Sequence, residues 1–196
     1  CEGDDYWTDP LKLQKQVDYL EVNEEYVGVA TNSKMIFDDS NKNRLFKNSD
    51  VDLDLKVDDF LGHRHFHTAS FLFKRDKIQG LTFPKILSGD RFLFLYIASK
   101  GLIRYLNQTT CVYRKNEGGI SKRVTSKNMV EDLNFIKATK VFLNHKQVNQ
   151  LSIFIYKTVF NYSHKIYLSH YLNIGTRLLI ATKFKRSTLR FLKNNL

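Results

Sequence analysis

The sequence has few cysteines, no long apolar segment and almost no acidic residues after residue 120. Two cysteines among 196 residues are too few for a disulfide framework or a four-thiolate zinc site, so we expect a reducing compartment. No run of about eighteen apolar residues is free of charge, so no membrane-spanning helix is expected. The chain begins at Cys1, with neither an initiator methionine nor a signal peptide.

Composition indicates a globular protein with an uneven charge. Hydrophobic residues make up 42% and charged residues 26%, which excludes a disordered tail or a collagen-like fibre. Residues 1–120 carry 17 basic and 18 acidic side chains, whereas residues 121–196 carry 14 basic and two acidic ones, Glu131 and Asp132. A segment this basic favours anionic partners, either the phosphates of nucleic acid or anionic lipid headgroups.

The first 120 residues mix helical and strand-like patterns. A helix over residues 8–23 is expected to bury one face, made of Leu13, Val17 and Leu20. Other expected elements are a strand within 26–37, a loop with at most one short helix over 38–59, a strand over 68–74, a helix over 90–100 capped by Gly101, and short strands over 103–106 and 110–114. The mixture predicts an α/β fold.

Helical patterns dominate the rest of the chain. Residues 149–171 and 174–195 both have helical spacing of their apolar side chains. We therefore predict two domains, an α/β domain over residues 1–123 and a basic, all-helical segment over residues 124–196.

An acidic cluster opens the chain. Glu2, Asp4 and Asp5 surround Gly3, directly before Trp7 and the first expected helix. Carboxylates at alternate positions of a turn can converge on a hard divalent cation such as Mg²⁺ or Mn²⁺. The alternative is a solvated acidic turn that caps the helix, which spacing alone favours.

Two further segments contain candidate catalytic and binding residues. Asp90 follows Ser88 and Gly89 at the start of an apolar helix, where it is either a general base or an ordinary N-cap. Residues 113–121 place Arg114 before a pair of glycines, so this segment is either a loop that closes over a diphosphate or a plain linker.

Three histidines alternate along residues 63–67. On an extended backbone, they would lie on one face. A zinc site is one interpretation, but no further ligand lies nearby in sequence, which favours ordinary surface histidines.

These segments, in this order, resemble the second half of a family 2 glycosyltransferase with the GT-A fold, a Rossmann-like α/β fold. The likeness covers about residues 1–123. The similar stretches are the metal-binding acidic motif and its helix over 2–16, the acceptor-side strand over 67–75, the catalytic-base motif over 88–90 and the donor-diphosphate loop over 113–121.

The resemblance implies inverting transfer of a sugar from a nucleotide-sugar donor to a saccharide or lipid-linked acceptor, in cell-surface polysaccharide synthesis. It assigns Asp90 as the catalytic base, Asp4 and Glu2 as ligands of Mg²⁺ or Mn²⁺, Asp5, Arg114 and Asn116 to the donor diphosphate, and His67 and Trp7 to the acceptor side. The sequence departs from the family at two positions. Glu2 stands where the family commonly has Asp, and Asn116 stands where relatives often have His.

In that family, a nucleotide-binding half precedes the acidic motif, and nothing precedes Cys1 here. We therefore expect a fragment of a longer enzyme, which does not transfer sugar by itself. The alternatives are a non-catalytic remnant of such an enzyme and a basic helical module that binds nucleic acid or another partner.

The basic helical segment predicts contact with a membrane. In a helix over 174–195, Lys183, Arg186, Arg190 and Lys193 share one face, beside an apolar line that includes Phe184, Phe191 and Leu192. This pattern is typical of an amphipathic helix on an anionic membrane, and predicts a cytoplasmic protein at the inner face of the membrane. A solvated tail whose apolar line packs on the catalytic domain is the alternative. Nucleic acid is less favoured as a partner, because no helix-turn-helix, zinc-finger or RNP-type signature occurs.

Overall fold

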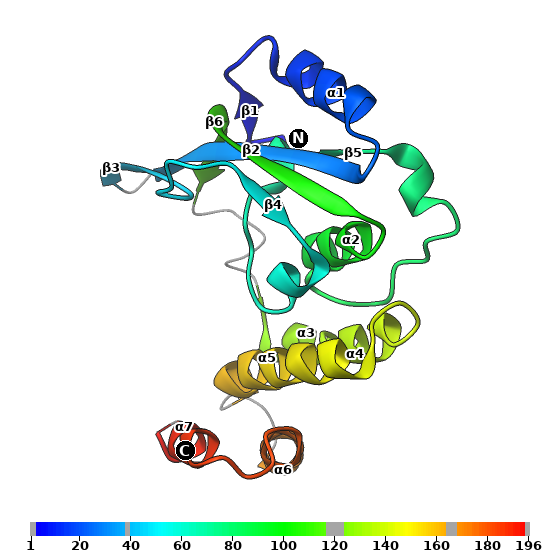
Figure 1. The fold of residues 1–196 in the computed structure, drawn as a ribbon. Coiled ribbons are helices and arrows are strands. Elements are labelled where there is room, and N and C mark those ends of the chain that lie inside the picture. The colour runs from blue at the N-terminus through cyan, green and yellow to red at the C-terminus, as the bar shows by residue number, and fades with distance from the viewer. Residues whose placement is uncertain (1–2, 38–39, 117–123, 164–167, 195–196) are drawn as a thin grey trace. The chain divides into compact units, whose positions relative to one another are not determined.

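The computed structural model describes residues 3–37, 40–116, 124–163 and 168–194, and shows a mixed α/β protein (Figure 1). The predicted α/β class is therefore confirmed. The chain forms two compact units. Unit 1 contains residues 1–81 and 93–123, and unit 2 contains residues 82–92 and 124–196. Residues 82–92 thus group with the helical part of the chain, although the predicted first domain included them.

Unit 1 is built around a six-stranded mixed sheet. Its strands are β1 (Tyr6–Trp7), β2 (Tyr26–Phe37), β3 (Ser40–Leu45), β4 (Leu53–Leu55), β5 (Leu72–Phe73) and β6 (Leu102–Lys115). The order is β1-β6-β2-β3, while β4 pairs with β6 and β5 pairs with β2. Strands β2 and β6 run parallel and the other pairs are antiparallel. The predicted strand over 26–37 is confirmed as β2, whereas the two short strands predicted within 103–114 are one continuous strand, β6.

Two glycines allow close approach around β2. A Cβ atom at Gly28 would lie 2.6 Å from the Phe71 ring, and one at Gly101 would lie 2.6 Å from a Val27 methyl group. Gly101 was predicted to cap a helix in the left-handed conformation, and this is wrong. Among the described glycines, Gly80 has the positive φ, at 74°. Gly101 is needed instead for space against β2.

Helix α1 (Lys12–Val22) lies against the sheet (Figure 1). The face that it buries is not the predicted one. Lys12, Gln16 and Leu20 are buried, whereas Leu13 and Val17 are 41% and 37% exposed. The side-chain amide of Gln16 donates to the backbone carbonyls of Val29 and Ser70, at 2.8 and 2.9 Å. These bonds pair carbonyl groups that burial would otherwise leave unsatisfied, and they set the rotation of the helix. The predicted apolar face is therefore wrong except at Leu20.

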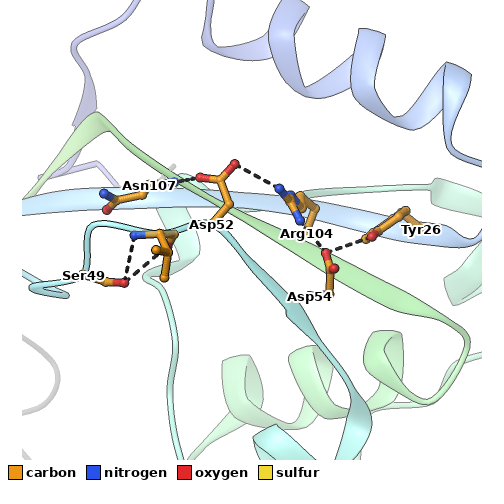
Figure 2. A network of polar contacts seen from close by, with 7 residues as sticks. Tyr26, Ser49, Asp52, Asp54, Arg104 and Asn107 are labelled. Atoms are coloured by element: carbon orange, nitrogen blue, oxygen red, sulfur yellow. Dashed lines mark hydrogen bonds and ion pairs between the residues drawn. The ribbon is translucent and has the colours of Figure 1, made fainter.

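Residues 38–59 were predicted as loop with at most one short helix. The described part contains one short helix, η1 (Val57–Phe60), but also forms strands β3 and β4, which were not predicted. Figure 2 shows what holds β4 against β6. Arg104 donates to Asp54 at 2.7 Å and to Asp52 at 3.1 Å, and the Tyr26 hydroxyl donates to Asp54 at 2.8 Å. The carboxylate of Asp52 also accepts the backbone N–H of Asn107 at 2.7 Å. The acidic composition of this segment suggested a loop. Two of its carboxylates, Asp52 and Asp54, are instead paired with Arg104, about fifty positions away in sequence.

The predicted strand over 68–74 is only partly present. Helix η2 (Thr68–Ser70) precedes the two-residue strand β5, and helix η3 (Arg75–Ile78) follows it. The rings of Phe66, Phe71 and Phe94 pack together at centroid distances of 4.7 to 5.4 Å. This cluster joins the segment to the second half of helix α2 (Gly89–Ala98). The helix predicted over 90–100 is confirmed as α2.

Unit 2 is helical in its described residues. It contains α3 (Ser126–Glu131), α4 (Leu133–Thr139), α5 (His145–Ser163), α6 (Leu168–Ala181) and α7 (Arg186–Lys193). The Phe92 ring contacts the rings of Phe83, Phe135 and Phe142, which explains why residues 82–92 belong to this unit. None of the helices in the described ranges is long and apolar enough to cross a membrane.

The predicted continuous helix over 174–195 is wrong. Helix α6 ends at Ala181, and the next helix starts at Arg186. Lys183 and Phe184 between them have φ angles of 51° and 56°. Their backbone N–H groups donate to the carbonyls of Ile180 and Leu179, which closes the end of α6. The break contains no glycine, so the helical spacing in the sequence continues across it.

The predicted apolar line of this segment is divided by the break. Leu192 is 9% exposed, and the Phe191 ring packs 5.8 Å from the Phe160 ring. Phe184, in the turn, is 62% exposed. Two of the three side chains thus pack within unit 2, because α7 turns its Thr188 and Leu192 side inward.

Candidate functional site

The acidic cluster and the end of β6 meet in unit 1. Antiparallel pairing of β1 with β6 matches Tyr6 with Val112, so residues just before β1 lie beside the residues just after Val112. The buried Asp5 carboxylate accepts the backbone N–H of Arg114 at 3.1 Å. The exposed Asp4 carboxylate accepts the side-chain amide of Asn116 at 3.0 Å.

Four of the predicted site residues are therefore neighbours although more than a hundred positions separate them in sequence. They are Asp4, Asp5, Arg114 and Asn116. The fifth predicted member, Glu2, lies outside the described residues. The arrangement gives a small polar cluster of carboxylate and amide groups, beside the Arg114 backbone, at one end of β6.

Carboxylate oxygens such as those of Asp4 and Asp5 suit a hard divalent cation. Mg²⁺ commonly uses one or two protein carboxylates together with phosphate oxygens of the substrate. In the described part of the chain, no group of three His, Cys, Asp or Glu side chains is placed to hold a metal ion.

The predicted acceptor-side residue Trp7 also lies in this region. Its indole N–H donates to the backbone carbonyl of Ala69 at 2.9 Å, and its side chain is 46% exposed. The ammonium group of Lys12 lies 4.8 Å from the centre of the indole ring. Trp7 is thus an aromatic ring held in place with much of its surface open.

Lys12 is a residue whose importance the sequence pattern did not show. It is 2% exposed, and its ammonium group donates to the Gln16 side chain at 2.8 Å. Burial lowers the pKa of Lys12, because removal from water penalises the charged form. Burial also raises the pKa of the nearby Cys111 thiol to about 11. Cys111 is therefore a protonated, buried thiol rather than a nucleophile.

His67, the second predicted acceptor-side residue, is buried next to the end of β6. Its Nδ1 atom shares a hydrogen bond of 2.6 Å with the Ser33 hydroxyl. Its ring stacks on Tyr113 at a centroid distance of 4.1 Å and contacts Phe46 at 4.2 Å. Burial lowers the pKa of His67 to about 4, with a smaller contribution from the charge of Arg64. His67 is therefore neutral at pH 7, and its 5% exposure leaves it behind Tyr113 rather than on the open surface.

The predicted zinc interpretation of the three histidines has no support among the described residues, where no metal-holding group is found. His65 bonds to the backbone carbonyl of Asp59 at 2.9 Å, and His67 bonds to Ser33. Their ring nitrogens thus take part in separate structural contacts.

Asp90 belongs to unit 2, in the first turn of α2. Its carboxylate accepts the backbone N–H of Arg91 at 2.7 Å. The helix dipole stabilises negative charge at this position. Asp90 is partly exposed, as a residue that meets a substrate must be.

The turn before Asp90 is held by Asp132, another residue whose role the sequence pattern did not show. Asp132 is 2% exposed, and one carboxylate oxygen accepts the backbone N–H groups of Leu87 and Ser88 at 2.8 and 3.0 Å. The other oxygen accepts the Ser88 hydroxyl at 2.7 Å. A buried carboxylate with three such donors fixes the backbone that leads into α2.

Neighbours of Asp132 hold the same turn. Glu131 pairs with the Lys85 side chain at 2.8 Å, and the Asn134 amide donates to the Lys85 carbonyl at 2.9 Å. Both acidic residues of the segment 124–196 thus contact the turn that precedes Asp90. Glu131 and Asp132 are the two acidic residues of an otherwise basic segment, and this contrast was the sequence feature that could have indicated their role.

Comparisons with known proteins find relatives of this chain, and the names of these relatives give no activity. No family model matches it. It is similar to the uncharacterized proteins Rv1520 of Mycobacterium tuberculosis and Mb1547 of Mycobacterium bovis, each 36% identical over 120 residues. The match covers 61% of this chain and 35% of each relative, so the chain spans about a third of the length of these relatives.

Proposed function

We propose that this chain forms part of an inverting glycosyltransferase of the GT-A type that uses a nucleotide-sugar donor. The observation that supports this proposal best is the contact of Asp4 with Asn116 and of Asp5 with Arg114. The resemblance assigns a metal and donor-binding role to both segments, and the fold brings them together.

The chemistry of this cluster suits a diphosphate leaving group. The Asp5 bond to the backbone of Arg114 fixes the position from which the guanidinium extends. A guanidinium can bind phosphate oxygens through two parallel hydrogen bonds. Asp4 and Glu2 are the residues proposed to hold Mg²⁺ or Mn²⁺, and such an ion would supply positive charge for the departing diphosphate.

In the proposed reaction, Asp90 accepts the proton of the acceptor hydroxyl as that oxygen bonds to C1 of the donor sugar. The bond between C1 and the diphosphate oxygen breaks, and its electron pair leaves with the nucleoside diphosphate. A single displacement inverts the configuration at C1. A positioned general base contributes about 10²–10⁴-fold to such a step.

The acceptor is proposed to be a saccharide or a lipid-linked saccharide. The half-exposed ring of Trp7, fixed by Ala69, offers a flat apolar surface for a sugar ring. The role of His67 is then indirect, because its ring stacks on Tyr113, the residue before Arg114. Cell-surface polysaccharide synthesis at the inner face of the membrane remains the proposed setting.

The test is a panel of nucleotide sugars offered to the longest natural protein that contains this sequence. Release of nucleoside diphosphate should depend on one donor and on Mg²⁺ or Mn²⁺, and Asp4→Asn should abolish the metal dependence. Asp50→Asn makes the same chemical change at an exposed residue and should leave turnover unchanged. Equal donor affinity with and without a chelator would reject the metal assignment, and no release from any donor would reject the function.

A further inference from the structure

We propose that unit 2 docks on an anionic lipid surface through the corner between α6 and α7. We call this corner the α6–α7 corner and define it as Ile180, Lys183, Phe184, Lys185, Arg186, Leu189, Arg190 and Lys193. The proposal goes beyond sugar transfer and does not depend on it.

The positive charge of this corner favours an anionic partner. Residues 133–196 contain eleven Lys and Arg side chains and no Asp or Glu. Arg186, Arg190 and Lys193 are exposed and occur at intervals of four and three residues along α7. This spacing puts them on one side of the helix, opposite the buried Thr188 and Leu192. A lipid surface with negative charge attracts each such residue within roughly 10 Å at physiological salt.

The apolar side chains of the corner favour lipid over nucleic acid. Phe184 and Ile180 are each 62% exposed, and Leu189 is 47% exposed. Burial of large apolar side chains at the boundary between headgroups and acyl chains lowers the free energy of the bound state. A phosphodiester backbone offers aliphatic side chains no comparable burial, because its attraction is electrostatic.

The backbone of the turn gives an independent reason. Lys183 and Phe184 occupy the left-handed region, which disfavours residues with a Cβ atom and suits glycine. The hydrogen bond from Phe184 N–H to the Leu179 carbonyl, at 2.9 Å, keeps the turn in this conformation. A lysine and a phenylalanine thus stand where glycine fits best, and both side chains are exposed. Large side chains at strained positions where glycine would fit without strain point to a use for the side chains themselves.

The first experiment measures sedimentation of the whole chain with vesicles. Vesicles that contain phosphatidylglycerol should bind at least about tenfold more protein than pure phosphatidylcholine vesicles, and binding should fall as salt rises. The triple variant Arg186→Glu, Arg190→Glu and Lys193→Glu should abolish binding. The matched control is Lys137→Glu, Lys140→Glu and Lys146→Glu, which makes the same change in net charge at exposed positions elsewhere in unit 2 and should retain most of the binding.

The second experiment separates docking from folding. Phe184→Gly should keep or raise the melting temperature, because glycine relieves the strained backbone, and should weaken vesicle binding several-fold. Val141→Ala, at another exposed apolar side chain, should leave binding unchanged.

Four results would overturn the proposal. They are equal binding to both kinds of vesicle, equal loss in the two sets of charge reversals, unchanged binding of Phe184→Gly, and preference for duplex DNA over anionic vesicles at matched salt. Since no readout involves sugar transfer, failure of the proposed activity leaves this test intact.

Discussion

The two compact units of this chain use charged side chains differently. Unit 1 has 17 basic and 17 acidic residues, whereas unit 2 has 14 basic and three acidic ones. In unit 1, carboxylates bond to residues far away in sequence, such as Asp54 to Arg104 and Asp5 to Arg114. In unit 2, the three acidic residues Asp90, Glu131 and Asp132 all lie in or contact the beginning of α2 and the turn before it.

This difference separates two roles of charge. Unit 1 uses charge to assemble a sheet and to join the segments of the candidate donor site. Unit 2 has its few carboxylates at the beginning of α2 or in contact with the turn before it, and the rest of the segment is basic. Substitutions of single charged residues should therefore affect one role without the other.

The largest effect is expected at Asp90. In the longest natural protein that contains this sequence, Asp90→Asn should lower turnover by about 10²–10⁴-fold and leave donor binding nearly intact, because an amide cannot accept the acceptor proton. Steady-state kinetics and calorimetry with the donor measure the two quantities. Turnover equal to that of the unaltered protein would remove Asp90 from the mechanism.

A large effect on stability is expected at Asp132. Asp132→Ala leaves two backbone N–H groups and the Ser88 hydroxyl without their partner, so the free energy of unfolding should fall by about 3 kcal/mol. Urea denaturation of the chain measures this change. Glu131→Gln removes only a partly exposed ion pair with Lys85 and should cost less than about 1 kcal/mol. Similar losses in the two variants would show that the buried carboxylate has no special role.

An effect of pH is expected at His67 in unit 1. Its folded pKa of about 4 lies below the value of 6.5 expected when unfolded, so between these pH values the unfolded chain binds more protons. Stability from this residue is fully present above about pH 6.5 and falls by about 2–3 kcal/mol as the pH drops towards 4. His67→Gln should flatten this part of the stability profile, whereas the exposed His63→Gln should not. A slope unchanged in His67→Gln would contradict the burial argument.

The smallest effect is expected from salt, and it contrasts the units directly. Raising the salt concentration from 0.05 to 0.5 M should stabilise unit 2 by about 1 kcal/mol, because its like charges repel, and should slightly destabilise the ion-paired β4 of unit 1. Hydrogen exchange followed separately in α5 and β6 measures both changes. Equal shifts in the two units would mean that the charge imbalance does not affect folding.

Local pattern was sufficient for the elements with strong periodicity. The strand over 26–37 and the helix over 90–100 are where the sequence predicts them, because the first half of the strand and most of the helix are apolar runs. The helical character after residue 124 follows for the same reason in the described residues.

Pattern failed where a polar contact from elsewhere in the chain decides the local structure. Gln16 rotates α1 away from its apolar face, and Arg104 holds an acidic segment as strand β4. The break at Lys183 and Phe184 carries no glycine, so nothing local announces it. In the first two cases, the deciding energy comes from partners far away in sequence, whereas the break is closed by local bonds to Ile180 and Leu179.

The sequence by itself therefore determined the α/β class, the main elements and the concentration of positive charge towards the C-terminus. Only the tertiary structure decided that Asp4 and Asp5 meet Asn116 and Arg114, and that Asp132 holds the turn before Asp90. The physical reason is that hydrophobic periodicity is a property of neighbouring residues, whereas the hydrogen bonds that assemble a site join residues that only the folded backbone brings together.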